Sequence, residues 1–98
     1  MEKNTRHCKL SRVKALVETG KVRLTATAVI GARQLGFTEL EAIGVVMSLT
    51  TVDFHKSMTT YADHTIWQDV YRRRTVRGDV YLKLTVIDDV LIVSFKEH

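Results

Sequence analysis

The alternation of apolar and polar residues after Val52 constrains the fold more than any other feature of the sequence. From that point the hydrophobic period is two, the period of a half-buried β-strand. No proline occurs anywhere in the chain to interrupt a strand. Arg77-Gly78 and Asp88-Asp89 supply turn residues between the alternating runs. The sequence therefore predicts four strands in antiparallel order: Val52–Thr60, Ile66–Thr75, Asp79–Ile87 and Val90–Lys96.

The first half of the chain carries helical signals instead. Residues 1–9 are polar and are expected to be frayed. Three helices are predicted from their capping and terminating residues: one from Ser11 to Gly20, one from Thr25 or Thr27 to Gly36, and one that opens with a capping box formed by Thr38 and Glu41. The third helix is expected to bury an apolar stripe made of Leu40, Ile43, Val46 and Met47.

A short β-branched segment, Lys21 to Thr25, separates the first two helices and is predicted to be an edge strand. Helices followed by a run of antiparallel strands indicate an α+β fold. In this fold the N-terminal helices pack on one face of a mainly antiparallel, twisted sheet and leave the other face open.

The last hairpin allows a prediction about individual residue pairs. If Asp88-Asp89 is a two-residue turn, Ile87 faces Val90, Leu84 faces Val93 and Tyr81 faces Lys96. Tyr81 and Lys96 would then be neighbours on the open face. If the loop at Arg77-Gly78 is also even in length, that face includes Gln68, Val70, Arg72 and Arg74, whereas a bulge would turn them away. Lys56 shares parity with Phe54 and Met58, which favours the core face for it.

Composition excludes several classes of protein. Cys8 is the only cysteine, so an internal disulfide is impossible. No apolar run is long enough to span a bilayer and no signal-peptide apolar block is visible, so a cytoplasmic protein is expected. Residues 1–52 carry eight Lys and Arg against four Glu, while residues 53–98 balance seven against seven. Within that neutral half, the arginines at 72, 73, 74 and 77 form a positive block that suits either phosphate contact or a solvated strand end.

The stretch from Phe54 to Tyr71 is rich in groups that stack, donate hydrogen bonds and titrate near neutrality. The chain has no Gly-x-Ser-x-Gly motif, no glycine-rich phosphate loop and no zinc-ligand spacing, and its carboxylates are scattered. What remains is Lys, Arg, Tyr, His and Gln on a sheet. This set suits cleavage of RNA through its own 2′-hydroxyl, because such cleavage needs a base, an acid and cations but no metal or other cofactor.

Several segments resemble the MqsR family of bacterial toxins: residues 54–61 (Phe-His-Lys-Ser-Met-Thr-Thr-Tyr), 63–71 (Asp-His-Thr-Ile-Trp-Gln-Asp-Val-Tyr), 80–83 (Val-Tyr-Leu-Lys) and 91–96 (Leu-Ile-Val-Ser-Phe-Lys). The similarity extends over nearly the whole chain. It implies a RelE-like fold and one endoribonuclease domain over residues 1–98. It also implies ribosome-independent cleavage of mRNA at short GC-containing sites, neutralisation by the zinc-containing antitoxin MqsA, and joint control of transcription with that antitoxin.

By this resemblance, Lys56, Gln68, Tyr81 and Lys96 match the family's activity residues. Further candidates for contact with RNA are His55, His64, Arg72, Arg74 and Lys83. At position 55 the family pattern leads one to expect Tyr, and His here bears on the identity of the base and on the pH profile. The competing hypothesis is a non-catalytic module that holds RNA on its basic sheet or pairs with a protein through a free sheet edge.

Overall fold

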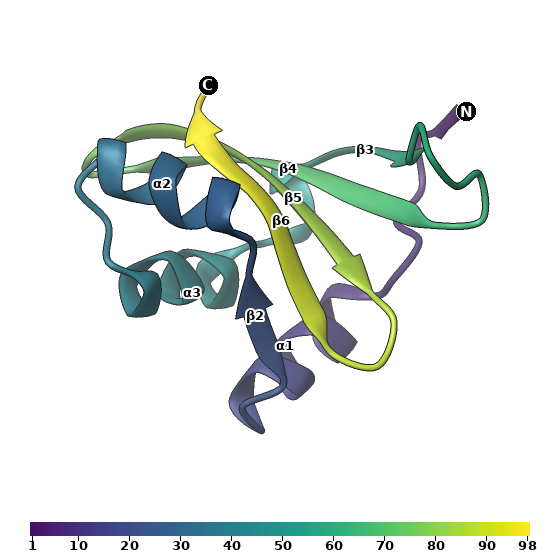
Figure 1. The fold of residues 1–98 in the computed structure, drawn as a ribbon, viewed down its shortest axis with the longest axis horizontal. Coiled ribbons are helices and arrows are strands. Elements are labelled where there is room, and N and C mark those ends of the chain that lie inside the picture. Colours follow the sequence, from purple (N-terminus) through teal and green to yellow (C-terminus); the bar gives the residue numbers. More distant parts are fainter.

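Six strands form one twisted sheet in the computed structural model, which describes residues 1–98 (Figure 1). The strand order is β1-β3-β4-β5-β6-β2, and every pairing is antiparallel except that of β2 with β6. The strands are β1 (Glu2–Lys3), β2 (Val22–Leu24), β3 (Phe54–Thr59), β4 (Trp67–Thr75), β5 (Gly78–Val86) and β6 (Val90–Glu97). The expected α+β architecture is confirmed, with Lys21 to Thr25 supplying the edge strand β2.

Three helices cover one side of this sheet: α1 (Leu10–Glu18), α2 (Ala26–Gln34) and α3 (Glu39–Ser48) (Figure 1). Thr25 caps α2 through its side chain, and the capping box of Thr38 and Glu41 opens α3 as predicted. Gly20 and Gly36 follow α1 and α2 with positive φ angles, which stops each helix. None of the helices has the length and apolarity needed to cross a lipid bilayer.

The core lies between the helices and the facing side of the sheet. The helices contribute small and branched residues, such as Val13, Ala32 and Val46, and the strands contribute larger ones. The strand residues of the core are Tyr71, Val80, Leu82, Leu84, Val90, Ile92 and Phe95, and each is at most 2% exposed. We call this side the covered face and the opposite side the open face.

Four expectations about local structure are wrong. Ser11 does not cap α1, because the helix begins one residue earlier and Lys9 occupies the cap without a side-chain bond. Leu40 is 81% exposed, so the apolar stripe of α3 begins later than its period indicates. The strand expected from Val52 starts at Phe54, since Thr51–Asp53 forms a 3-10 turn in which Asp53 accepts a hydrogen bond from the backbone N–H of Thr50.

The fourth correction concerns residues 1–9, which are ordered rather than frayed. Glu2 and Lys3 pair with Met58 and Ser57 and so extend the sheet by one strand. The backbone N–H groups of His7 and Cys8 donate to the buried carboxylate of Asp69, which also accepts from the hydroxyl of Ser57. The polar composition of this segment predicts fraying because its partners, which hold it in place, lie more than 50 residues away in the chain.

The last hairpin reaches the predicted register by a different route. Val86 pairs with Val90, so the turn has three residues, and Leu84 faces Ile92 rather than Val93. A register shift between Lys83 and Leu84 then compensates for the extra turn residue. The two errors cancel, and the predicted pairing of Tyr81 with Lys96 is confirmed.

Candidate functional site

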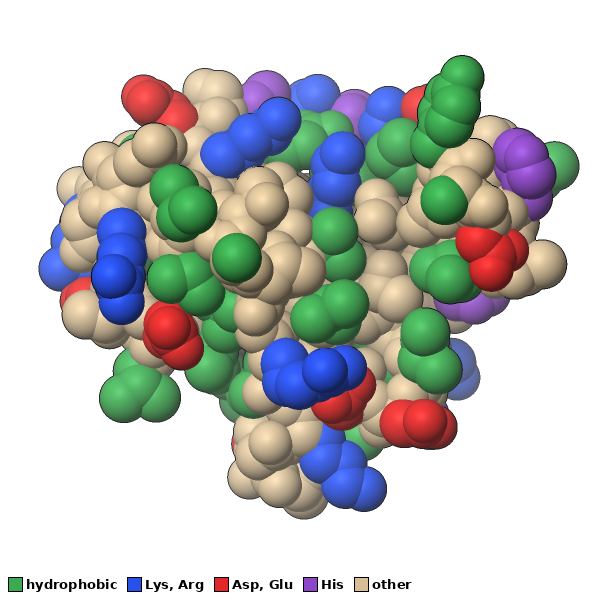
Figure 2. All heavy atoms as spheres, viewed as in Figure 1, with side chains coloured by type: hydrophobic (Ala, Val, Ile, Leu, Met, Phe, Trp, Pro, Cys, Tyr) green, Lys and Arg blue, Asp and Glu red, His purple; other side chains and the backbone are tan.

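The open face carries two rows of side chains that run across the strands. Residues paired directly across a sheet point to the same side of it. In the first row Lys56, Val70, Lys83 and Ser94 are successive partners, and in the second row Arg72, Tyr81 and Lys96 are. The even loop after Thr75, which pairs with Gly78, aligns these rows as expected. Lys, Arg and His side chains line the upper rim of the molecule in Figure 2.

A β-bulge places Lys56 in the first row, contrary to the parity argument. Phe54 pairs with Tyr71 and packs edge-on against it on the covered face, but Lys56 pairs with Val70. Between these two pairs β3 therefore has one residue more than β4, namely His55. Every later side chain of β3 points to the face opposite to the one that strict alternation predicts. Alternation in the sequence cannot reveal such a bulge, so the parity of Lys56 with Phe54 predicts the wrong face.

Tyr81 is the centre of the cluster. The guanidinium of Arg72 lies 6.0 Å and the ammonium of Lys96 5.7 Å from the centroid of its ring. His98 stacks on the ring at 5.5 Å with an interplanar angle of 25°, and His55 approaches it edge-on at 6.4 Å. Tyr81 thus stands among two cations and two imidazoles while remaining half-exposed.

The electrostatics of the cluster favour the neutral form of His55. Its Nε2 lies 3.0 Å from a guanidinium nitrogen of Arg72, and since arginine can only donate, this imidazole nitrogen accepts. Burial lowers the pKa of His55, and the charges of Arg72 and Lys56 lower it further. Lys56 donates to Glu2 over 2.8 Å, and this bond raises the pKa of the Lys56 ammonium. The site therefore places an imidazole that accepts a hydrogen bond beside fixed positive charges.

The other predicted site residues lie at different distances from this cluster. Gln68 is on the open face at the beginning of β4, where it pairs with Met58 of β3. It lies four residues before Arg72 on the same strand. Arg74 faces Asp79 at the far end of the hairpin, and its side chain is 90% exposed. His64 lies in the exposed loop between β3 and β4, where the Asp63 carboxylate binds Thr65 instead of the imidazole.

Two residues of the site were missed in the sequence. Glu2 lies in a segment whose polar composition predicts fraying, and no motif marks His98. The backbone N–H of His98 donates to the carbonyl of Asp79, which continues the hairpin pairing by one more position. Extending the predicted register of Tyr81 and Lys96 outward would have found His98, since residues two apart on a strand share a face.

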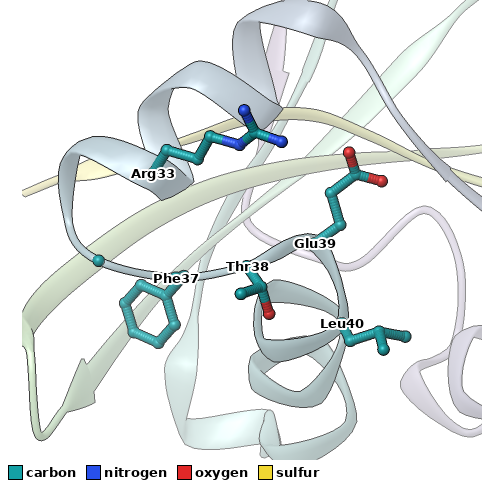
Figure 3. A pocket seen from close by; sticks show the side chains of 6 residues that line it. Arg33, Phe37, Thr38, Glu39 and Leu40 are labelled. Carbon is teal, nitrogen blue, oxygen red and sulfur yellow. The ribbon is translucent and has the colours of Figure 1, made fainter.

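The surface hollow with the largest volume is not part of the open face. It has a volume of about 650 Å³ and lies between α2 and α3, where Arg33, Phe37, Thr38, Glu39 and Leu40 line it (Figure 3). The cluster around Tyr81 is instead a shallow, cationic surface. Such a surface fits an extended anionic polymer better than a small enclosed molecule.

Comparison with known proteins places the chain among bacterial toxins. Residues 5–97 match the family model described as "Motility quorum-sensing regulator, toxin of MqsA". The chain is also similar to the mRNA interferase toxin MqsR of Escherichia coli (strain K12), with 60% identity over 97 residues, which is 99% of each chain.

Proposed function

Since the chain belongs to the MqsR toxin family, we propose that it is an endoribonuclease that cleaves single-stranded mRNA at short GC-containing sites without the ribosome. The observation that carries this proposal is the gathering of Lys56, Arg72 and Lys96 near Tyr81 on one open face. Its identified relative is named an mRNA interferase, which supports the same activity. We assign residues 1–98 to one catalytic domain acting in the cytoplasm, where its substrate is.

The reaction we propose begins with attack by the 2′-oxygen of the substrate on the adjacent phosphorus. His55, whose neutral form the cluster favours, accepts the 2′-hydroxyl proton once the guanidinium of Arg72 turns from the imidazole to the phosphate. The bond from phosphorus to the 5′-oxygen breaks, and Tyr81 donates the proton that this leaving oxygen requires. The products are a 2′,3′-cyclic phosphate and a free 5′-hydroxyl.

Cations supply the electrostatic part of catalysis. We assign Lys56 and Lys96 to stabilisation of the negative charge that grows on the phosphorane. Gln68 orients the substrate at the beginning of β4, Arg72 binds the reacting phosphate, and contacts to more distant phosphates come from His64, Arg74 and Lys83. All of these roles are filled by side chains, so cleavage is expected to need no metal ion.

The test combines a mixed RNA pool with one modified substrate. The purified chain, freed of any antitoxin, should cut the pool in EDTA, and the new 5′ ends should map to GC-containing sites. A 2′-deoxy substitution at the nucleotide 5′ to a cut should abolish cleavage there but leave binding largely intact. Efficient cutting of the deoxy strand, or a strict requirement for Mg²⁺, would overturn the proposed chemistry. Binding without any cleavage would favour the alternative of a non-catalytic module.

We also propose a cognate antitoxin as the protein partner, since the family description names the toxin together with MqsA. The resemblance suggests an MqsA-like, zinc-containing antitoxin that neutralises the chain and regulates transcription together with it. Expression of the chain alone should stop growth, and expression of the pair should restore it. Normal growth on strong expression of folded chain would count against a toxin.

A further inference from the structure

Helix α2 closes the edge of β6 at the point where β2 ends. Strand β2 pairs with β6 only from Val90 to Ile92. The chain then turns at Thr25, whose backbone N–H donates to the carbonyl of Ile92 and whose hydroxyl donates to that of Val93. From there α2 runs beside the remaining part of β6 (Figure 1). The helix therefore occupies the place of a missing edge strand, level with the end of β6 that carries Lys96.

Gly31 allows this helix to lie unusually close to the strand. A Cβ atom at position 31 would overlap the backbone carbonyl oxygen of Phe95, and this carbonyl cannot move as a flexible side chain could. The close approach brings one face of α2 to the border of the open face. Thr27, Ile30 and Gln34, spaced three and four residues apart, lie on that face of the helix.

These helix residues and the end of β6 enclose a groove of about 280 Å³. It is lined by Thr27, Ile30 and Gln34 on one side and by Ser94 and Lys96 on the other. Ile30 is 58% exposed, although it is a large apolar residue on a helix that otherwise packs on the sheet. Lys96 belongs both to this groove and to the cluster around Tyr81, so the two sites are continuous.

We infer that the α2–β6 groove binds a nucleobase of the substrate, next to the phosphate held at Tyr81, and that it contributes to the choice of cleavage site. This inference rests on the proposed function and adds a subsite to it. A nucleobase has apolar faces and a polar edge. Ile30 offers an apolar contact for a face, and the amide of Gln34 offers both a donor and an acceptor for an edge. Lys96 at the rim attracts the phosphate that links this base to the scissile position.

The experiment measures binding, so that it does not depend on cleavage. The probe is a fluorescein-labelled single-stranded oligoribonucleotide containing GC, with 2′-deoxy substitutions at both of these nucleotides to prevent cutting. A series of the same probe carries one abasic nucleotide at each position in turn. Dissociation constants are measured by anisotropy for the wild type, for Ile30→Ser and Gln34→Ala, and for Leu40→Ser as the matched control. Leu40 is an exposed apolar helix residue outside the groove, 81% exposed against 58% for Ile30.

The groove variants should each weaken binding of the intact probe roughly tenfold, as expected for loss of one base contact. One abasic position should weaken wild-type binding by a similar factor, and at that position the groove variants should cause little further loss. Leu40→Ser should bind every probe like the wild type. The subsite would be overturned if the affinity losses of a groove variant and of an abasic nucleotide simply add at every position. It would also be overturned if the groove variants bind the intact probe like the wild type.

A failure of the proposed function would look different from a failure of the subsite. Suppose that the wild type leaves ribo-oligonucleotides intact, but the groove variants still lose no further affinity at one abasic position. RNA binding in the groove is then supported, and the nuclease assignment is wrong. If the wild type cuts RNA but the coupling between groove and abasic position is missing, the nuclease stands and the groove has no part in base recognition.

Discussion

The two faces of the sheet use the same strands for opposite purposes. Along β5, Leu82 and Leu84 are at most 2% exposed under the helices, while Tyr81 and Lys83, which alternate with them, are only half-buried on the open face. The pleat alone sends alternate side chains to a dry core and to a wet surface. Residues that hold the fold together and residues that we assign to cleavage are therefore neighbours in sequence but are separated by the thickness of the sheet.

Each face contains an exception, and the exceptions differ in kind. On the open face Val70 is fully buried and pairs with Lys56 on one side and Lys83 on the other. The row of cations therefore has an apolar residue at its centre, against which the lysine stems can pack. On the covered side Asp69 is 5% exposed but accepts three hydrogen bonds, two of which attach the N-terminal segment through His7 and Cys8. An apolar residue supports the site, whereas a polar one supports the fold.

The largest effect is expected on the covered face. Leu82→Ala should lower the free energy of unfolding by about 2–5 kcal/mol, because a fully buried side chain leaves a cavity. Cleavage per folded molecule should be unchanged, since the neighbouring Tyr81 points the other way. Urea unfolding and RNA cleavage below the unfolding transition measure the two quantities. If Leu82→Ala lowers cleavage while the free energy of unfolding stays at the wild-type value, the two faces do not have separate roles.

The polar exception gives the next largest effect. Asp69→Asn should destabilise the fold by about 1.5–3 kcal/mol, because an amide group cannot accept all the donors that face the carboxylate. The amide protons of His7 and Cys8 should lose protection in hydrogen exchange before those of β5. If protection in residues 1–9 stays at the wild-type level, Asp69 does not hold that segment.

The pair on the open face should show the reverse pattern. Tyr81→Phe removes one hydroxyl, which we assign as the acid, and Lys96→Ala removes one stabilising positive charge. Each variant should lower the rate of cleavage by about tenfold or more. Stability should stay within roughly ±0.5 kcal/mol of the wild type, as for most exposed sites. Calorimetry and initial cleavage rates are the measurements. Large destabilisation with cleavage retained would identify both as packing residues.

How much of this could be predicted depended on whether a feature was local. The period of two predicted β4, β5 and β6 nearly to their ends, and the capping box predicted the start of α3, since both signals lie within a few adjacent residues. The pairing of Tyr81 with Lys96 was predicted from the same local hairpin, although from a two-residue turn; the turn has three residues, and the bulge after Lys83 restores the register. This part of the site was available from the sequence, and it could have been extended to His98.

The remaining features depend on contacts between distant segments. The bulge at His55 turns Lys56 to the open face, yet nothing in the local sequence marks it, because the extra residue is defined only against β4. Strand β1 needs β3, more than 50 residues later, as its partner. The α2–β6 groove needs the close approach of Gly31 to Phe95. Such features come from tertiary packing, which a pattern along one segment does not contain.

The smallest expected effect is a shift in the pH profile of cleavage, and it concerns His55 on the open face. The pKa of His55 lies below its ordinary value because of burial and then because of Arg72, with Lys56 and His98 acting in the same direction and Glu2 opposing them. If neutral His55 is the base, cleavage is lost as the pH falls through this lowered pKa. Removing the charge in Arg72→Gln should raise that pKa, so the acidic limb of the kcat/KM profile should move to higher pH.

Arg74 provides the matched control for this last prediction. Arg74→Gln removes the same charge two residues further along β4, where the side chain faces Asp79 instead of His55. It should lower affinity for RNA through a lost phosphate contact but leave the acidic limb where the wild type has it. Since the position of the limb does not depend on the overall rate, weaker binding by either variant does not obscure the comparison. A limb that stays in place in Arg72→Gln, or that moves equally in both variants, would remove His55 from the role of base and leave Tyr81 and His98 as the groups that move protons.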